Sequence, residues 1–300
     1  MAVVIDWLEG RGPYLTLVGA IDDATGKVPY GLFRGQEDAQ GYTLLLRKIV
    51  ESYGIPEALY HDGHGIFERS RREPETIEEQ LTGRREPTQF GRIMEELGII
   101  SITARSPQAK GRIERLWGTF QERLKSELRI AGAKTAGEAN RVLLDFLPRF
   151  NLKFAVPAKE AGLAYRQPPE GFNPDEVFCF KYYRTAGRDN VVRFGEHRIQ
   201  IMPTNGQLSY VKARVEVHER MDGSLAVYYK GQCLATKTAP PEAPVLRARN
   251  MTRFIPGSKP QALTTSVAGK TLEPKIHHPY KPARNHPWRR PFKMYVDKRG

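Results

Sequence analysis

Cysteine is scarce in this chain of 300 residues, which contains only Cys179 and Cys233. They lie far apart and lack the neighbouring His and Cys residues of a zinc site, so neither a disulfide framework nor a zinc site has support. No apolar run reaches the roughly 18 residues of a membrane-spanning helix, and no signal peptide opens the chain. No internal repeat is found. We therefore expect a cytoplasmic protein that folds around an apolar core.

Acidic residues are nearly absent from the carboxyl-terminal part of the chain. Residues 244–300 carry thirteen Lys and Arg but only Glu273 and Asp297, so they supply +11 of the formal net charge of +13. A strongly basic chain indicates an anionic partner, most often nucleic acid, and a membrane surface is the weaker alternative. The folded body is close to neutral, so the basic character belongs to the tail.

The chain is 40% hydrophobic and long enough for about two domains. Apolar periodicity predicts a hairpin of residues 14–21 and 27–33, helices over 38–53 and 90–97, strands over 57–61 and 99–104, and a helix that bears Ile113, Leu116, Trp117, Phe120, Leu124 and Leu128. Asp22 and Asp23 are expected to form the hairpin turn. This β-β-α-β-α-β-α order predicts an α/β layer fold with a mixed sheet.

Three other stretches have a different character. Residues 68–89 are rich in Arg, Glu, Pro and Gly, which predicts an insertion or mobile loop beside the site. Short strand candidates between residues 172 and 240 alternate with turn residues, which predicts a small all-β barrel. The Pro-rich basic residues after 240 are expected to be extended or disordered without DNA.

Two carboxylates lie where chemistry is expected. Asp62 ends a predicted strand, and Glu114 opens a predicted helix. Breaking and joining phosphodiester bonds requires an activated attacking oxygen and a stabilised leaving oxygen, which two Mg²⁺ ions held by clustered carboxylates provide. Either acid alone is equally consistent with a solvated loop carboxylate, so the argument depends on the surrounding motifs.

Those motifs carry a family resemblance. Residues 106–115 (SPQAKGRIER) resemble the S-P-x-x-x-G-x-x-E-R signature of the retroviral integrase superfamily, and residues 61–67 (HDGHGIF) resemble the segment that holds its second metal ligand. With residues 7–13 (WLEGRGP), 20–26 (AIDDATG), 81–82 (LT) and 88–92 (TQFGR), the chain resembles the catalytic region of ISNCY-type insertion-sequence transposases over roughly residues 5–240.

The resemblance implies a fold, an activity and a cofactor. It implies an RNase H-like catalytic core over residues 1–150, a linker over 151–171, a small barrel like the one after the Mu transposase core over 172–240, and a basic tail over 241–300. The implied enzyme is a DDE-type polynucleotidyl transferase that uses two Mg²⁺ or Mn²⁺ ions. The implied metal ligands and catalytic residues are Asp62, Glu114 and a first aspartate.

The sequence around the first aspartate differs from the family pattern. Its members carry an amino-terminal helix-turn-helix region and an I-D-G-S strand, separated by several residues from the W-L-E-G-R-G segment, whereas here Val3-Val4-Ile5-Asp6 runs directly into Trp7. Either Asp6 is the first ligand or the true one is missing. The 52-residue interval from Asp62 to Glu114 also exceeds that of retroviral integrases, and the charged insertion accounts for it.

Basic residues near these acids are candidates for DNA contact. Lys110, Arg112 and Arg115 are suited to phosphate oxygens, with a solvated basic loop as the alternative. In the tail, Trp288, Arg289 and Arg290 join an aromatic ring to two cations, a combination that can hold DNA or dock on a neighbouring subunit. His61 and His64 flank Asp62 and are expected to be hydrogen-bonded loop histidines rather than proton-transfer groups.

The expected partner is double-stranded DNA, both element ends and target, bound by a homo-oligomer because two ends must be joined in one event. A prokaryotic, nucleoid-associated protein is implied. Two other hypotheses remain open: an inactive transposase remnant that only binds DNA, and an RNase H-like nuclease that cuts without joining. DNA binding without metal dependence would favour the former, and cleavage without strand transfer the latter.

Overall fold

The computed structural model describes residues 2–69, 73–83, 85–104, 107–159, 162, 164–204 and 206–240, apart from the side chains of residues 78, 107–113, 116 and 117. The chain divides into a unit of Met1–Glu242 and a unit of Ala243–Gly300, and the second lies outside the described residues. The predicted tail, with Trp288, Arg289 and Arg290, therefore lies there too. No helix in the described part is long and apolar enough to cross a membrane.

The first sheet contains three antiparallel strands in the order β1-β2-β3. The strands are β1 (Ala2–Ile5), β2 (Leu15–Gly19) and β3 (Gly31–Arg34). Asp22 accepts hydrogen bonds from the backbone of Ala24 and Thr25, which confirms the predicted turn between β2 and β3. Side chains alternate across the sheet, so each of its faces carries an apolar cluster.

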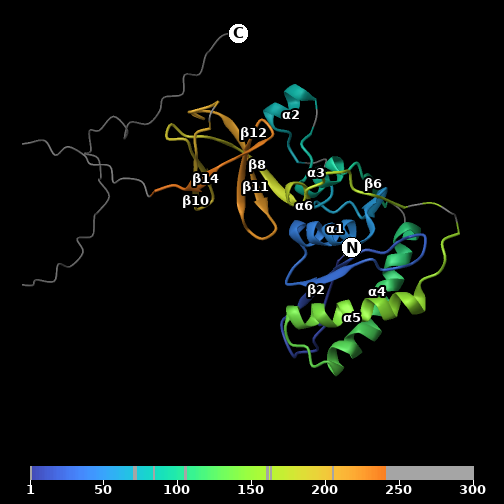
Figure 1. Ribbon diagram of the computed structural model, residues 1–300. Helices are drawn as coiled ribbons and strands as arrows, with labels where there is room; N and C mark the ends of the chain where they lie inside the picture. Colours follow the sequence, from blue (N-terminus) through green and yellow to red (C-terminus); the bar gives the residue numbers. More distant parts are fainter. Residues whose placement is uncertain are drawn as a thin grey trace, which may run out of the picture. The chain divides into compact units, whose positions relative to one another are not determined.

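Helices cover both faces of this sheet (Figure 1). Leu15, Leu17 and Phe33 pack against α4 (Pro107–Ile130) and α5 (Ala136–Phe154), whereas Val18 packs against α1 (Ala39–Tyr53). The α1 helix begins after Asp38, whose carboxylate accepts from the Gly41 amide, as the sequence predicts. The three layers confirm the α/β class.

Two Asn residues of α5 each form a pair of hydrogen bonds with the backbone of β3 or of the segment before it. The Asn140 side-chain amide donates to the Phe33 carbonyl and accepts from the Phe33 N–H, at 3.0 and 2.7 Å. Asn151 does the same for Val28, with both distances 2.8 Å. These amides satisfy backbone groups at the sheet edge that would otherwise lack partners.

The predicted mixed sheet is not formed as one sheet among the described residues. The strands β5 (Ala58–His61) and β6 (Ile100–Thr103) pair in parallel, but no ladder joins them to β1 in the part of the chain described. The predicted strand over residues 57–61 is confirmed as β5, in which Tyr60 is 62% exposed. Each of these strands has only four residues, which offers few ladder bonds to a neighbour.

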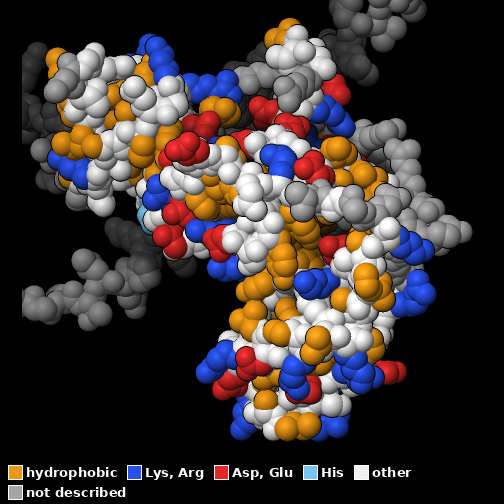
Figure 2. Space-filling view, turned by 45° about the vertical axis from the view of Figure 1, so that its right-hand side comes forward, with side chains coloured by type: hydrophobic (Ala, Val, Ile, Leu, Met, Phe, Trp, Pro, Cys, Tyr) orange, Lys and Arg blue, Asp and Glu red, His pale blue; other side chains and the backbone are white. Residues whose placement is uncertain are grey.

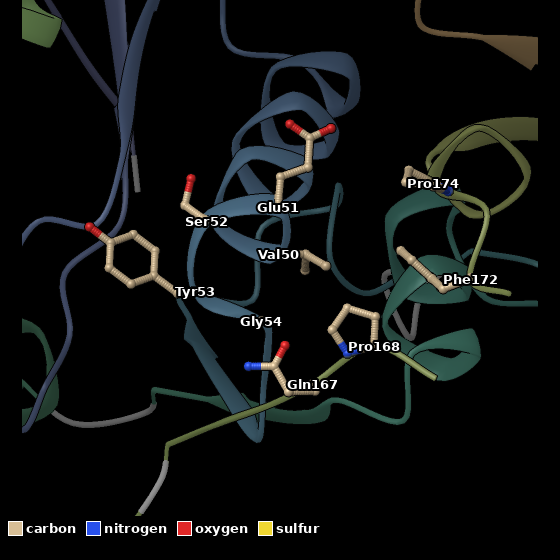
Figure 3. Close-up of a pocket in the computed structure, with 9 residues that line it drawn as sticks. All are labelled: Val50, Glu51, Ser52, Tyr53, Gly54, Gln167, Pro168, Phe172 and Pro174. Carbon is tan, nitrogen blue, oxygen red and sulfur yellow. The ribbon is translucent and has the colours of Figure 1, made fainter. Parts of the chain in front are cut away.

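A short return segment closes over the end of α1. The strand β4 (Ile55–Pro56) pairs antiparallel with β7 (Tyr165–Arg166), and Gly54 lets the backbones meet, since a Cβ there would lie 2.6 Å from the Arg166 carbonyl oxygen. A pocket of about 260 Å³ lies beside this contact (Figure 3). Its lining includes Val50, Glu51 and Phe172 but none of the predicted site residues.

The predicted mobile insertion contains an ordered helix, α2 (Ile77–Thr82). It begins with a capping box, in which Thr76 and Glu79 each accept from the other's backbone N–H. Glu79 is only 3% exposed and also accepts from the Glu86 N–H and the Arg69 guanidinium. These bonds to the carboxylate lower the pKa of Glu79 from 4.5 to about 2. The helix α3 (Gln89–Glu96) follows.

The region after residue 172 is all-β except for α6 (Pro174–Val177). Its strands are β8 (Cys179–Thr185), β9 (Val191–Phe194), β10 (His197–Ile201), β11 (Arg214–Arg220), β12 (Leu225–Tyr229), β13 (Gln232–Leu234) and β14 (Thr236–Thr238). They form two antiparallel sheets, β13-β12-β11-β8 and β14-β10-β9, around one apolar cluster. The predicted strands are confirmed, but the described strands do not close into a barrel, because no ladder joins the two sheets.

Candidate functional site

Asp62 lies directly after β5, at the end of a parallel strand pair. The backbone of this end is fixed, since the Ala104 N–H donates to the His61 carbonyl at 2.7 Å. The Asp62 side chain is exposed, and one of its oxygens accepts from the His64 N–H at 3.2 Å. Gly63 has a φ of +73°, which favours glycine at this bend. The carboxylate is therefore presented to solvent from a defined turn.

The His61 side chain stabilises this turn through a hydrogen bond and a ring contact. This side chain is buried, and its ring stacks on Phe67 with centroids 4.6 Å apart. Nδ1 accepts from the Gly63 N–H at 3.1 Å, so the neutral ring carries its proton on Nε2 and donates to Ser101 Oγ at 2.8 Å. Burial lowers the pKa of His61, against the opposing effects of Glu68 and Asp62. Because both nitrogens have partners within the chain, His61 is hydrogen-bonded as predicted, but it is the last residue of β5 rather than a loop residue.

Residues 62–67, here called the Asp62 loop, are anchored at their far end by Phe67. The Phe67 ring makes edge contacts with Tyr42 and Phe90, at centroid distances of 4.8 and 5.3 Å. Thr88 donates its hydroxyl to the Ile66 carbonyl at 2.7 Å. The loop thus spans two buried anchors, His61 and Phe67.

Asp6 follows β1 and is half-buried. One carboxylate oxygen accepts from the Gly10 N–H at 3.0 Å, which stabilises the turn before β2. The other, Oδ1, is buried and has no hydrogen-bond partner among the described residues. Asp6 therefore has a structural task and also an oxygen that could accept a further partner.

The motif after Asp6 has structural reasons of its own. Trp7 and Leu8 are fully buried, and Glu9 forms an ion pair with Arg129 in the last turn of α4. Hydrogen bonds from Arg129 and then Arg11 lower the pKa of Glu9 to about 2. A Cβ at Gly12 would lie 2.1 Å from the Lys134 carbonyl oxygen, so only glycine fits. The motif joins the β1–β2 connection to the end of α4.

Glu114 does not open its helix as predicted. The α4 helix begins at Pro107, so Glu114 lies about two turns inside it, with an exposed side chain. The physical reason is Pro107, because proline fits the first turn of a helix, where its missing N–H costs nothing. Arg115 is also exposed, whereas the side chains of Lys110 and Arg112 lie outside the described ones.

The donor types of the three acids fit a hard cation, because carboxylate oxygens are the ligands of Mg²⁺. Their arrangement does not yet form a site. Among the described residues, no group of three or more His, Cys, Asp and Glu side chains is placed to hold a metal ion. Asp6, Asp62 and Glu114 are all described, so the structure does not bring them together.

Sequence reasoning missed the residues that support the site. Phe67, Thr88 and Glu79 organise the segment after Asp62 through contacts within the chain. One signal was available, because Thr76 and Glu79 have the T-x-x-E spacing of a capping box. The face in Figure 2 carries interspersed acidic and basic side chains rather than one basic patch, which agrees with the small net charge outside the tail.

Two proteins named as transposases are similar to most of this chain. "Putative transposase y4bF" of Sinorhizobium fredii is 34% identical over 231 residues, 76% of this chain and 49% of that protein. "Transposase for insertion sequence IS1202" of Streptococcus pneumoniae is 28% identical over 287 residues, 93% of this chain and 55% of that protein. The chain therefore spans about half the length of these relatives.

Other comparisons add less. No protein-family model matches the chain. A cryo-electron microscopy structure of the simian T-cell lymphotropic virus intasome in complex with the PP2A regulatory subunit B56 gamma matches 80% of this chain and 78% of that chain, with a TM-score of 0.39 and 12% identity. We draw no conclusion from so distant a match. The two sequence matches show that this chain is similar to proteins named as transposases.

Proposed function

We propose that this chain is the catalytic part of a DDE-type transposase of the ISNCY kind, with an RNase H-like core. The observation that carries the proposal is the 34% identity to a protein named as a transposase over 231 residues, 76% of this chain. The presentation of Asp62 at the end of a strand, on a loop with two buried anchors, supports a role for this carboxylate in the reaction.

The proposed reaction has two steps of the same kind. In the first, a water oxygen attacks phosphorus at the element end, the bond from phosphorus to the 3′ oxygen breaks, and the 3′ oxygen leaves as a hydroxyl. In the second, this hydroxyl attacks a target phosphorus, the bond from that phosphorus to the target 3′ oxygen breaks, and the target 3′ oxygen leaves as a hydroxyl with the proton that the attacking hydroxyl gives up. Two Mg²⁺ or Mn²⁺ ions held by Asp6, Asp62 and Glu114 would supply the charge that activates the attacking oxygen and stabilises the leaving one.

The chain's basic residues have a separate role in this proposal. Lys110, Arg112 and Arg115 contact DNA phosphates near Glu114, and Trp288, Arg289 and Arg290 hold DNA at the tail. Contacts of this kind weaken as salt rises, because bound counterions are released when DNA binds. We further propose that a homo-oligomer on DNA joins both ends together.

A second candidate function is DNA binding without catalysis. The observation that favours it is that Asp6, Asp62 and Glu114 do not form a metal-binding group in the described structure. In that case, affinity for DNA would persist without divalent cations.

The test is cleavage and joining of a labelled duplex that carries the element ends, with and without Mg²⁺. We expect Asp62→Asn and Glu114→Gln each to remove all products while DNA binding is kept. Asp23→Asn, in the β2–β3 turn, and Glu122→Gln, on the exposed surface of α4, are the matched controls. Binding without products from the unaltered chain would select the second function, and cut products without joined ones would indicate a nuclease.

A further inference from the structure

Two neighbouring residues at the start of α3 hold two distant parts of the chain. Thr88 precedes the helix and contacts the Asp62 loop, and Gln89 is its first residue and contacts β8. Because Thr88 and Gln89 are joined by a peptide bond, a shift of β8 is expected to displace the Asp62 loop, and a shift of the loop to displace β8.

Thr88 has three bonds in this arrangement. Its hydroxyl donates to the Ile66 carbonyl at 2.7 Å and lies 3.2 Å from the Phe67 carbonyl oxygen. The same oxygen accepts from the Gly91 N–H at 2.9 Å and so caps α3. A Cβ at Gly91 would lie 3.2 Å from the Phe67 carbonyl oxygen, which shows how closely the loop lies against the helix.

Gln89 binds the backbone of Lys181 with both atoms of its side-chain amide. The amide nitrogen donates to the Lys181 carbonyl at 2.8 Å, and the amide oxygen accepts from the Lys181 N–H at 3.0 Å. Since β8 is an edge strand of its sheet, these outward backbone groups need partners. Gln89 takes the place of a neighbouring strand.

Charged groups one and two turns along α3 strengthen the same contact. The Arg92 guanidinium donates to the Cys179 carbonyl, two residues before Lys181. The Lys181 ammonium lies 2.8 Å from the Glu96 carboxylate, which also accepts from Arg92 at 2.8 Å. One side of α3 therefore binds β8 at three points.

A neighbouring face of α3 is apolar and packs with the Asp62 loop. Phe90 contacts Phe67, and both belong to the cluster that contains Phe178, the fully buried residue immediately before β8. Well-packed interiors transmit displacement because they contain few voids. The β8 edge and the Asp62 loop thus share a rigid helix and a continuous packed cluster.

We propose that Gln89 and Lys181 are positioning residues, through which the sheet that contains β8 sets the placement of the Asp62 loop. The inference rests on the proposed function in one respect, namely that Asp62 takes part in the reaction. Neither residue touches Asp62, and Gln89 and Lys181 lie 92 positions apart. Loosening of the β8 contact therefore loosens the loop.

The test compares hydrogen exchange in the full chain without DNA or metal. Gln89→Ala removes both bonds to Lys181, and Lys181→Met removes the ion pair with Glu96 from the β8 side. We expect both variants to raise exchange at the Gly63, His64 and Phe67 amides by roughly fivefold to tenfold, the equivalent of one or two lost hydrogen bonds. Gln89→Glu, which still accepts from Lys181 but cannot donate, should fall between Gln89→Ala and the unaltered chain.

The matched control is Asn151→Ala, which removes the same pair of side-chain amide bonds from Val28, in the segment before β3. Faster exchange at the loop in Asn151→Ala, equal to that in Gln89→Ala, would mean general loosening and would overturn the proposal. Faster exchange at the Lys181 amide alone, with unchanged exchange at the loop, would also overturn the proposal.

If the unaltered chain makes no DNA products, the proposed function fails, while the exchange result still shows whether the β8 contact and the Asp62 loop are coupled. Where products form, Gln89→Ala should lower kcat more than it weakens DNA binding.

Discussion

The two consecutive segments after β5 are held in opposite ways. The Asp62 loop is anchored to His61, Phe67 and Thr88 by aromatic contacts and uncharged hydrogen bonds. The described residues between 69 and 88 are instead organised by one buried carboxylate, Glu79. The first depends on packing and the second on charge.

This difference predicts how each segment responds to a loss of side-chain volume and to a change of pH. Packing in a dense interior is sensitive to the removed volume and insensitive to pH. A carboxylate that accepts several hydrogen bonds holds its neighbours only while it is ionised. We therefore expect the Asp62 loop to keep its shape while His61 is neutral, and the α2 segment to keep its shape while Glu79 is ionised.

The largest expected effect is on the aromatic anchor. Phe67→Ala should lower the free energy of unfolding by about 3–5 kcal/mol, because it leaves a cavity between Tyr42, His61 and Phe90. Ile77→Ala in α2, where the side chain is 76% exposed, should change it by less than about 0.5 kcal/mol. Denaturant unfolding of both variants measures the contrast, and equal costs would remove the distinction between the two segments.

The two threonine caps offer a finer contrast. Thr88→Ala removes the cap of α3 and the bond to Ile66, so a loss of about 1–2 kcal/mol in global stability is expected. Thr76→Ala removes the cap of α2 only, so faster exchange should stay within that helix. Denaturant unfolding and segment-resolved exchange together check this. A global loss for Thr76→Ala would show that α2 unfolds together with the core.

Much of the fold could be predicted where the signal is local. Asp38 and Gly54 mark the ends of α1, and the apolar spacing of Phe90, Ile93 and Met94 marks α3. The closure of strands into sheets could not be predicted in the same way, because ladders between β1 and β5, or between β9 and β8, depend on groups distant in sequence. For this reason the described strands form several smaller sheets instead of the single mixed sheet and closed barrel that were predicted.

The candidate site was predictable one residue at a time. The place of Asp62 at a strand end follows from the apolar residues before it, whereas the place of Glu114 was missed because Pro107 starts α4 earlier. The order of the insertion depends on Glu79 accepting from Thr76, Glu86 and Arg69, and only the first of these has a local sequence signal. The roles of Asp6, Asp62 and Glu114 stay predictions.

Removal of the Glu79 charge should have a smaller, local effect. Glu79→Gln keeps the shape of the side chain but loses the charge that binds Arg69, so we expect faster exchange at the amides of Ile77–Thr82 with an unchanged midpoint of global unfolding. Glu75→Gln is the control, because the Glu75 side chain is exposed and its ion pair with Arg85 lies at the surface. Equal effects of both variants would contradict a special role for Glu79.

The smallest expected effect is a pH response confined to α2. The pKa of Glu79 is lowered from 4.5 to about 2 by bonds from the Thr76 and Glu86 backbone and from Arg69. An acid with a lowered pKa in the folded state stabilises that state above its ordinary pKa, and this contribution is lost as pH falls toward the lowered value. Exchange protection of α2, corrected for the intrinsic pH dependence of exchange, should therefore be constant near neutral pH and decline between 4.5 and about 2.

The amides of α1, within the packed core, are the internal reference. A parallel decline of α1 and α2 would mean that acid acts on the whole fold, whereas a decline of α2 alone, absent in Glu79→Gln, would establish that one carboxylate holds the segment beside the Asp62 loop.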